Sequence, residues 1–284
     1  MPNLPLTQPA HFVQMNETEF LKEASVIVEK AQAKQIFLRF LGAFAVYVHS
    51  LDNQVALSAF KSLGRLGEGK PMFTDLDLAL YGKQRGNATK ILDEAGFKPD
   101  NMANMMFGGR RLIYHHPEGK FPIDLFIDKM EFSHDVEFGK KPGSGRLELD
   151  YPTISLADIV LEKLQIHQIN RKDVLDLIVL FLGHDVLDKP GNDMIDAGYV
   201  SRILSNDWGF WYDATNNLGS VDALARELAS QKAGITAGHC AIVTDRVAGL
   251  RKIIDACPKT KDWEKRAKTG TSKPWYREVG EVSR

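Results

Sequence analysis

The sequence predicts an α+β protein in which a mixed sheet flanked by helices precedes an all-helical half. Apolar segments of strand character, some with alternating polar residues, are concentrated before residue 150. From residue 155 onward the apolar spacing is helical, and capping pairs mark the helix starts. The sequence contains no low-complexity linker and no internal repeat. We therefore expect two domains that follow one another directly, at residues 1–150 and 151–284.

The composition is that of an ordinary folded protein. Hydrophobic residues make up 44% and charged residues 26% of the 284 residues, which excludes disordered and collagen-like classes. The formal net charge is −1, and the two cysteines lie far apart without a Cys-x-x-Cys pair, which argues against a disulfide framework or a zinc ribbon. Residues 1–5 do not resemble a leader, and the apolar run at residues 40–48 is too short to span a bilayer. We expect a soluble cytoplasmic protein with no membrane partner.

The first elements are a helix, a buried strand and a second helix. Asn16 and Glu19 form a helix-capping pair, and apolar residues at helical spacing follow to residue 33. Residues 36–41 are mostly apolar and predict a short buried strand. Gly42 follows this strand directly and begins a helix. The local order is therefore strand, glycine turn, helix.

Three further strands and a short helix are predicted between residues 73 and 128. Polar and apolar side chains alternate in residues 73–81, which gives this strand one acidic face. A helix over residues 87–95 ends at a glycine. The strands at 110–114 and 121–128 are joined by a Pro-Glu-Gly turn and form a hairpin.

The second half begins with two capped helices. Ser155 and Asp158 cap a helix that extends to about residue 168, and Asn170 and Asp173 cap the next one, to about residue 182. The pattern remains helical up to residue 256. No strand is expected in this half.

Three acids form a candidate metal site. A strand places residues i and i+2 on one face, so the carboxylates of Asp75 and Asp77 project side by side. Two like charges at that distance require a cation, and Mg²⁺ prefers oxygen ligands. Asp124 on a neighbouring strand can supply a third ligand, whereas Asp128 is placed at a turn. The alternative interpretation of this acidic strand is a solvated sheet edge.

The combination of motifs resembles the nucleotidyltransferase superfamily that includes DNA polymerase beta, in its small bacterial form. The matching segments are Leu41-Gly42-Ala43-Phe44-Ala45, Thr74-Asp75-Leu76-Asp77-Leu78 and Pro122-Ile123-Asp124-Leu125-Phe126. The helical blocks at residues 155–164 and 170–177 resemble those that follow the catalytic half in nucleotidyltransferase-like proteins, including toxins of abortive-infection systems. The resemblance covers residues 36–182.

This resemblance implies Mg²⁺-dependent transfer of a nucleoside monophosphate from an NTP, ATP among them, to an acceptor, with release of pyrophosphate. Asp75, Asp77 and Asp124 would be the catalytic and metal-binding residues. The residues implied in nucleotide binding are Gly42, Ala43, Thr74, Lys163 and Asp173. The backbone N–H groups at the glycine turn would hold the triphosphate. The acceptor is left open among RNA, a protein and a small molecule, and the oligomeric state is not specified.

Two departures from the family pattern favour a second hypothesis. Ala43 replaces the second Gly or Ser of the turn, which removes a hydroxyl contact to phosphate, and an insertion of roughly residues 51–71 precedes the acidic strand. The alternative function is a catalytically inactive module of the same fold that binds a nucleotide or a protein, in a toxin–antitoxin or scaffold role. Lys163 also has an alternative interpretation as an exposed lysine, and Asp173 as a capping acid.

Basic and aromatic residues outside these motifs also have two interpretations. Arg111 is interpreted as an edge charge rather than a phosphate ligand. The aromatic cluster at residues 208–212 is expected in the core. Residues 259–277 combine lysines and arginines with Trp263 and Trp275, a composition that binds RNA or forms a solvated helix with a frayed tail.

Overall fold

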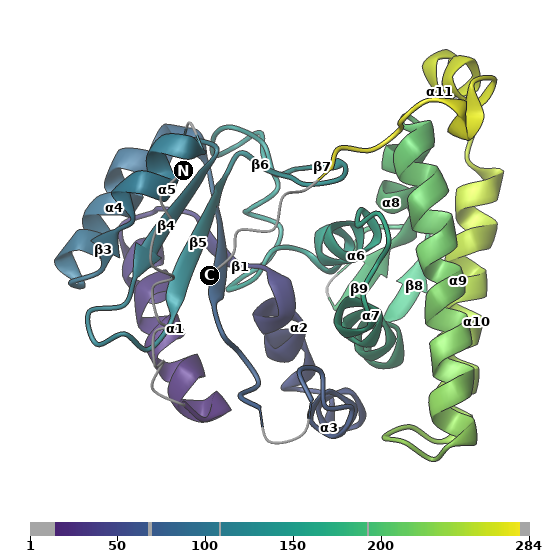
Figure 1. Cartoon of the computed structure of the whole chain (residues 1–284), viewed down its shortest axis with the longest axis horizontal. Coiled ribbons are helices and arrows are strands. Elements are labelled where there is room, and N and C mark those ends of the chain that lie inside the picture. Colours follow the sequence, from purple (N-terminus) through teal and green to yellow (C-terminus); the bar gives the residue numbers. More distant parts are fainter. Residues whose placement is uncertain (1–14, 68–69, 108, 192, 279–284) are drawn as a thin grey trace, which may run out of the picture.

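The structure, a computed structural model, describes residues 15–67, 70–107, 109–191 and 193–278. Residues 1–5, which the sequence analysis compared with a leader, lie outside this part of the chain. A sheet with its helices lies beside a helical half, and α2 (Gly42–Ser50) lies between the sheet and α7 (Arg171–Gly183) (Figure 1). Within the described residues, no helix has both the length and the apolar character to cross a bilayer.

The central sheet is mixed, as predicted. Its strands, in spatial order, are β1 (Leu38–Phe40), β2 (Leu76–Leu80), β5 (Pro122–Ile127), β4 (Arg111–His115) and β3 (Lys98–Pro99). β2 and β5 are parallel and the other neighbours antiparallel, so the predicted hairpin of β4 and β5 is confirmed. The register places Asp77 directly opposite Asp124. The carboxylates of two neighbouring strands therefore lie on one face of the sheet.

The first half contains the predicted helices and two that were not predicted, η1 (Gly82–Gln84) and α5 (Asn101–Met106). The others are α1 (Glu17–Ala33), α2, α3 (Gln54–Ser62) and α4 (Arg85–Glu94). Asn16 and Glu19 form the predicted capping box at the start of α1. α3 occupies the predicted insertion, and the side chain of its N-cap Asn53 donates a hydrogen bond to the Gly183 carbonyl, 3.1 Å away. The insertion is therefore attached to the end of α7.

The second half is mainly helical. Its helices are α6 (Leu156–Leu164), α7, α8 (Ala197–Leu204), α9 (Trp208–Ser230), α10 (Ala237–Ala256), α11 (Lys261–Ala267) and η2 (Gly270–Ser272). The expectation of no strand here is corrected by a parallel pair, β8 (Asp185–Leu187) and β9 (Met194–Asp196). Each of these two strands is too short to show an alternating pattern in the sequence. A second small sheet, β6 (Lys129–Glu131) with β7 (Asp135–Glu137), follows β5.

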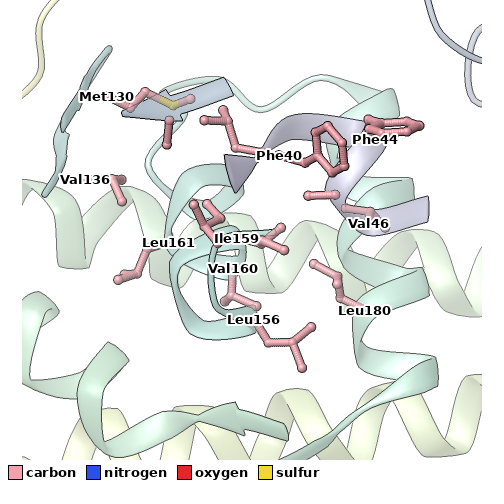
Figure 2. Packing of buried hydrophobic residues seen from close by; sticks show 14 of the residues in the cluster. Phe40, Phe44, Val46, Met130, Val136, Leu156, Ile159, Val160, Leu161 and Leu180 are labelled. Carbon is pink, nitrogen blue, oxygen red and sulfur yellow. The ribbon is translucent and has the colours of Figure 1, made fainter. Parts of the chain in front are cut away.

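One hydrophobic cluster extends through both halves. In Figure 2, Phe40 and Phe44 from the sheet half lie beside Ile159 of α6 and Leu180 of α7. All four side chains are buried. Full burial of such a side chain contributes about 1.5–3 kcal/mol relative to its exposure. Packing of α2 against α6 and α7 therefore fixes the helical half against the sheet.

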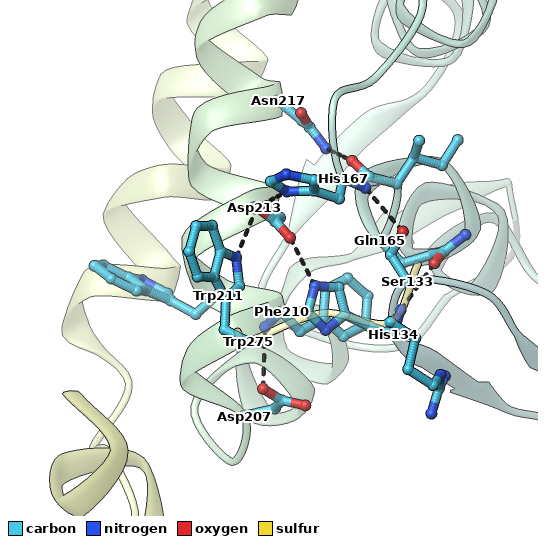
Figure 3. A network of polar contacts seen from close by, with 12 residues as sticks. Ser133, His134, Gln165, His167, Asp207, Phe210, Trp211, Asp213, Asn217 and Trp275 are labelled. Carbon is cyan, nitrogen blue, oxygen red and sulfur yellow. Dashed lines mark hydrogen bonds and ion pairs between the residues drawn. The ribbon is translucent and has the colours of Figure 1, made fainter. Parts of the chain in front are cut away.

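Residues 259–277 form a C-terminal strap that returns to the sheet half. Asp213 of α9 accepts hydrogen bonds from His134, His167 and Trp275, at 2.8, 3.0 and 3.1 Å (Figure 3). At the end of the strap, the Arg277 backbone N–H donates to the Ser133 carbonyl, 3.1 Å away. One buried carboxylate thus joins the strap, α9 and the segment between β6 and β7.

The strap contains a solvated helix, α11, which has no buried residue, but the tail that follows it is not frayed, because its side chains make contacts within the chain. Arg266 donates to carbonyls of the strap itself and lies over the Trp208 ring. The Tyr276 ring stacks on His167 with centroids 3.5 Å apart, and Trp263 packs edge-on against Trp211. Trp208 itself is buried, as expected of the aromatic cluster. The strap residues Trp263, Arg266 and Tyr276 are partly buried and pack on the outside of the second half.

Asp213→Asn should destabilise the protein. Burial alone would raise the pKa of Asp213, but hydrogen bonds from His134, His167 and Trp275 hold it below its usual value. The stabilisation is therefore present above the usual carboxylate pKa and is lost as the pH falls towards the lowered value. At pH 7 we expect the free energy of unfolding in urea to fall by about 1.5–3 kcal/mol, the range for hydrogen bonds to a charged group.

The matched control is Asp245→Asn, at an exposed position of α10. It should change the free energy of unfolding by less than about 0.5 kcal/mol. Equal effects of the two substitutions would show that Asp213 does not hold the strap.

Candidate active site

Asp75, Asp77 and Asp124 come together at one end of the parallel strand pair. Asp75 directly precedes β2, Asp77 lies within it, and Asp124 is on β5. One carboxylate oxygen of each lies within 4.8 Å of the others. Leu76 and Leu78 are fully buried on the opposite face of β2. The alternation in the sequence therefore orients the acids as expected, and the solvated-edge interpretation is wrong because β2 lies inside the sheet, between β1 and β5.

Gly42 lies directly against Asp77. Its φ is +70°, and a Cβ built at this position would be 2.6 Å from Oδ2 of Asp77. A larger residue would be strained and would displace the carboxylate. The Gly42 N–H donates to Oε2 of the buried Glu162, 2.9 Å away. This amide, which the resemblance assigned to the triphosphate, is thus bonded within the protein.

Lys163 is buried among three carboxylates, so the interpretation as an exposed lysine is wrong. It is 4% exposed. Its Nζ lies 2.9 Å from Asp173, 3.1 Å from Asp176 and 3.4 Å from Glu162. Burial lowers the pKa of Lys163, but these acids outweigh it and raise the pKa above its usual value. The ammonium group is charged and engaged by protein carboxylates.

The same cluster contains the residues around the start of α7. The Asp173 N–H donates a hydrogen bond to Oδ1 of the N-cap residue Asn170, 3.1 Å away, so the predicted cap is present. Burial would raise the pKa of Asp173, but Lys163 lowers it overall. Asp176 pairs with Lys163 and with Arg65, whose Nε is 2.8 Å away. Arg65 belongs to the inserted segment, so the insertion contributes a buried cation to this site.

Asp77 lies among other carboxylates that disfavour its charged form. Burial raises its pKa well above the usual value, and the neighbouring Asp75, Asp124 and Glu162 raise it further, against a smaller opposing effect of Lys163. The three strand acids present only oxygen donors at close range, which is the donor set that Mg²⁺ binds. The residues therefore fit a divalent cation of this type.

Arg111 lies in the site, so its interpretation as an edge charge is wrong. Its guanidinium pairs with Oδ2 of Asp124. The rings of Phe107 and Phe126 lie 5.0 and 5.2 Å from the guanidinium carbon. In the β4–β5 register Ile113 faces Asp124, which places Arg111 two residues away on the same face. The hairpin register would have identified Arg111 from the sequence.

The acids form part of the wall of a pocket of about 430 Å³. This is within the usual size range of small-molecule sites. Ala43, Thr74, Lys163 and Asp173 also line it, whereas Gly42 lies behind the wall. The lining residues that sequence analysis did not identify include Arg65, Phe73, Phe132, Glu162 and Lys172. The insertion and the segment after β5, neither of which carries a motif, supply two of these five, Arg65 and Phe132.

No protein-family model matches this sequence, and no curated protein sequence matches it. Solved structures are similar over about half of the chain. A crystal structure of ANT(2'')-Ia in complex with adenylyl-2''-tobramycin is 14% identical, over 51% of this chain and 75% of its own, with a TM-score of 0.30. The solution structure of the antibiotic-resistance factor ANT(2'')-Ia is 15% identical, over 52% of this chain and 71% of its own, with a TM-score of 0.31. The function therefore has to be argued from the site itself.

Asp77→Asn should stabilise the metal-free protein. Because the folded-state pKa of Asp77 is raised, the metal-free chain loses stability as the pH rises from the usual carboxylate value through the raised one. The neutral amide removes this loss, and we expect the free energy of unfolding in EDTA at pH 7 to rise by about 1–3 kcal/mol. Mg²⁺ should raise the melting temperature of the wild type but not of the variant. A variant less stable than the wild type in EDTA would contradict this account.

Lys163→Met should be strongly destabilising. Removing the ammonium leaves its three buried carboxylates without their shared cation. We expect a loss of about 3–5 kcal/mol in urea unfolding, the range for breaking a buried ion pair. Lys172→Met, at an exposed position on the rim of the same pocket, is the control and should cost less than about 0.5 kcal/mol. A small effect at Lys163 would mean that its ammonium is not held as described.

Proposed function

We propose that this protein is a Mg²⁺-dependent nucleotidyltransferase, which transfers a nucleoside monophosphate from an NTP to an acceptor and releases pyrophosphate. The observation that carries the proposal is the convergence of Asp75, Asp77 and Asp124 within 4.8 Å on the wall of a pocket of about 430 Å³. The glycine turn before α2 lies directly against these acids. The sequence motifs and this arrangement support the same chemistry.

Asp75, Asp77 and Asp124 would hold Mg²⁺, which when bound neutralises these acids and the triphosphate of the NTP. In the transfer, the acceptor oxygen forms a bond to the α-phosphorus while the bond to the bridging oxygen breaks. Pyrophosphate leaves with the electron pair of that bond. Asp124 would accept the acceptor proton, and Arg111 would fix the orientation of its carboxylate through Oδ2. Positioning and charge stabilisation supply most of the rate in phosphoryl transfer.

The phosphate contacts would differ from those implied by the resemblance. The Gly42 amide and the Lys163 ammonium are both bonded to Glu162, which leaves the rim of the pocket to contact the triphosphate. Lys172 is exposed there and lines the pocket. We assign it the electrostatic contact to phosphate that the sequence placed at Lys163. Thr74 is also exposed at this rim.

The acidic pocket does not identify the acceptor. RNA binding by the strap would use its exposed lysines, because Arg266, Trp263 and Tyr276 make contacts within the chain. A protein hydroxyl or a small molecule is equally compatible with a pocket of this size. A toxin role is supported only by the resemblance of the helical blocks at residues 155–164 and 170–177.

A second candidate function is a non-catalytic nucleotide-binding module. The observation that favours it is the weak phosphate-binding capacity of the turn before α2. The Gly42 N–H donates to Glu162, and Ala43 has no hydroxyl group. Such a module would bind an NTP with Mg²⁺ and become more stable, but would not turn it over.

The deciding experiment is pyrophosphate release with each of the four NTPs and Mg²⁺, with and without total cellular RNA. Wild type is compared with the double variant Asp75→Ala/Asp77→Ala. We expect the double variant to lose at least about 100-fold in rate, because the charge-stabilising arrangement is removed. The control is Asp245→Ala/Asp255→Ala, at two exposed positions of α10, and it should retain the wild-type rate.

The outcomes separate the two candidates. Release that depends on both strand acids supports transfer, and its dependence on RNA identifies the acceptor class. Thermal stabilisation by an NTP with Mg²⁺, in the absence of release under every condition, would favour the binding module. Release that the double variant retains would overturn the assignment of the site.

A further inference from the structure

A second group of metal-binding side chains lies at the opposite end of α2 from the strand acids. His49 is in the last turn of α2, His184 directly follows α7, and Asp193 precedes β9. One nitrogen of each imidazole and one carboxylate oxygen lie within 4.8 Å of one another. His49 is seven residues beyond Gly42, a rise of about 10 Å along the helix. The group is therefore separate from the candidate active site.

His184 is a buried imidazole with one unpartnered ring nitrogen. Its side chain is 1% exposed, and Nε2 has no hydrogen-bond partner in the described part of the chain. Nδ1 lies 2.8 Å from Oδ1 of Asp193. Buried polar groups in folded proteins are almost always bonded, so an unbonded one requires a ligand or an explanation. A metal ion at this position would bind the lone pair of the imidazole.

His49 is oriented towards the same point by its surroundings. Its side chain is 11% exposed, and its ring centroid lies 5.7 Å from that of His184. Nε2 of His49 lies 2.8 Å from the Thr153 hydroxyl and 3.6 Å from Oδ2 of Asp150. Polar partners of this kind fix the ring orientation of histidines that bind metals. The imidazole is thus held in place before any ion binds.

The donor set distinguishes this group from the strand acids. Two imidazoles and one carboxylate are the ligands that Zn²⁺ binds, whereas the three strand acids offer oxygen alone. The Asp193 side chain is 77% exposed, so the group is open to solvent on one side. An ion can enter from that side, and water can complete a four-coordinate shell.

We propose that His49, His184 and Asp193 form a second metal site, which binds Zn²⁺ and is distinct from the Mg²⁺ site. Its ligands come from α2 of the sheet half and from the segment between α7 and β9 of the helical half. An ion bound there joins the two halves directly. Because α2 begins at Gly42, beside Asp77, the same ion fixes the helix that supports the candidate active site. The proposal does not depend on the function of that site.

The test is a calorimetric titration of the full-length chain with Zn²⁺. The protein is first treated with EDTA and dialysed, and the buffer contains excess Mg²⁺, which occupies sites that offer only oxygen ligands. We expect wild type to bind one equivalent of Zn²⁺ and to melt at a higher temperature when it is bound. Asp193→Ala and His49→Gln should each weaken Zn²⁺ binding at least about 100-fold, the upper range for loss of a group that supports a metal. Asp188→Ala, at an exposed position near the same loop, is the matched control and should bind as wild type does.

Stability in EDTA separates loss of the site from loss of the fold. Because the Asp193 side chain is largely exposed, Asp193→Ala should melt in EDTA close to wild type, and only the increase caused by Zn²⁺ should disappear. Failure of wild type to bind Zn²⁺ at about 100 µM would overturn the proposal, as would equal binding by both ligand variants. Loss of Zn²⁺ binding in Asp77→Asn would place the ion at the strand acids and would also overturn it.

Discussion

The structure depends on one buried ammonium group. Lys163 binds Glu162, Asp173 and Asp176, and Glu162 in turn accepts the N–H of Gly42, the residue that lies against Asp77. The chain of contacts therefore extends from α7 through α6 and the glycine turn to the acidic strand. Removing charged groups from water is costly unless every partner is present. The three carboxylates of this cluster are paired with two cations of the protein itself, Lys163 and Arg65.

Charge is thus divided between two adjacent clusters with different roles. The cluster around Lys163 contains its own cations, including Arg65 from the insertion, and is structural. In the cluster around Asp77, Arg111 pairs with Asp124, Arg65 interacts electrostatically with Asp75, and the pKa of Asp77 is raised by burial and by its acidic neighbours. The family resemblance assigned Lys163 to the nucleotide, but its burial assigns it to the first cluster. A residue of the expected type at the expected position can therefore have a structural function.

The sequence was informative where the pattern was local. Alternation in residues 73–81 located the acidic strand, capping pairs located the starts of α1, α6 and α7, and the Pro-Glu-Gly turn identified the β4–β5 hairpin. It was not informative where the answer depends on packing. α6 is buried on every side, so no periodicity distinguishes Glu162 and Lys163 from its apolar residues. Arg111, the short β8–β9 pair and the contacts of the strap depend on strand register or on partners far along the chain.

The strap also determines when, during synthesis, the wall of the pocket can complete its packing. Arg277 donates to the carbonyl of Phe132, a residue of the pocket wall, across a separation of 145 residues. A ribosome makes the sheet, the strand acids and the glycine turn long before it makes this arginine. Domains generally fold in the order of their synthesis, and contacts between distant residues form late. The pocket wall therefore reaches its final packing only after α6 to α11 have been made, so a nascent chain carries the three strand acids before it has a finished pocket.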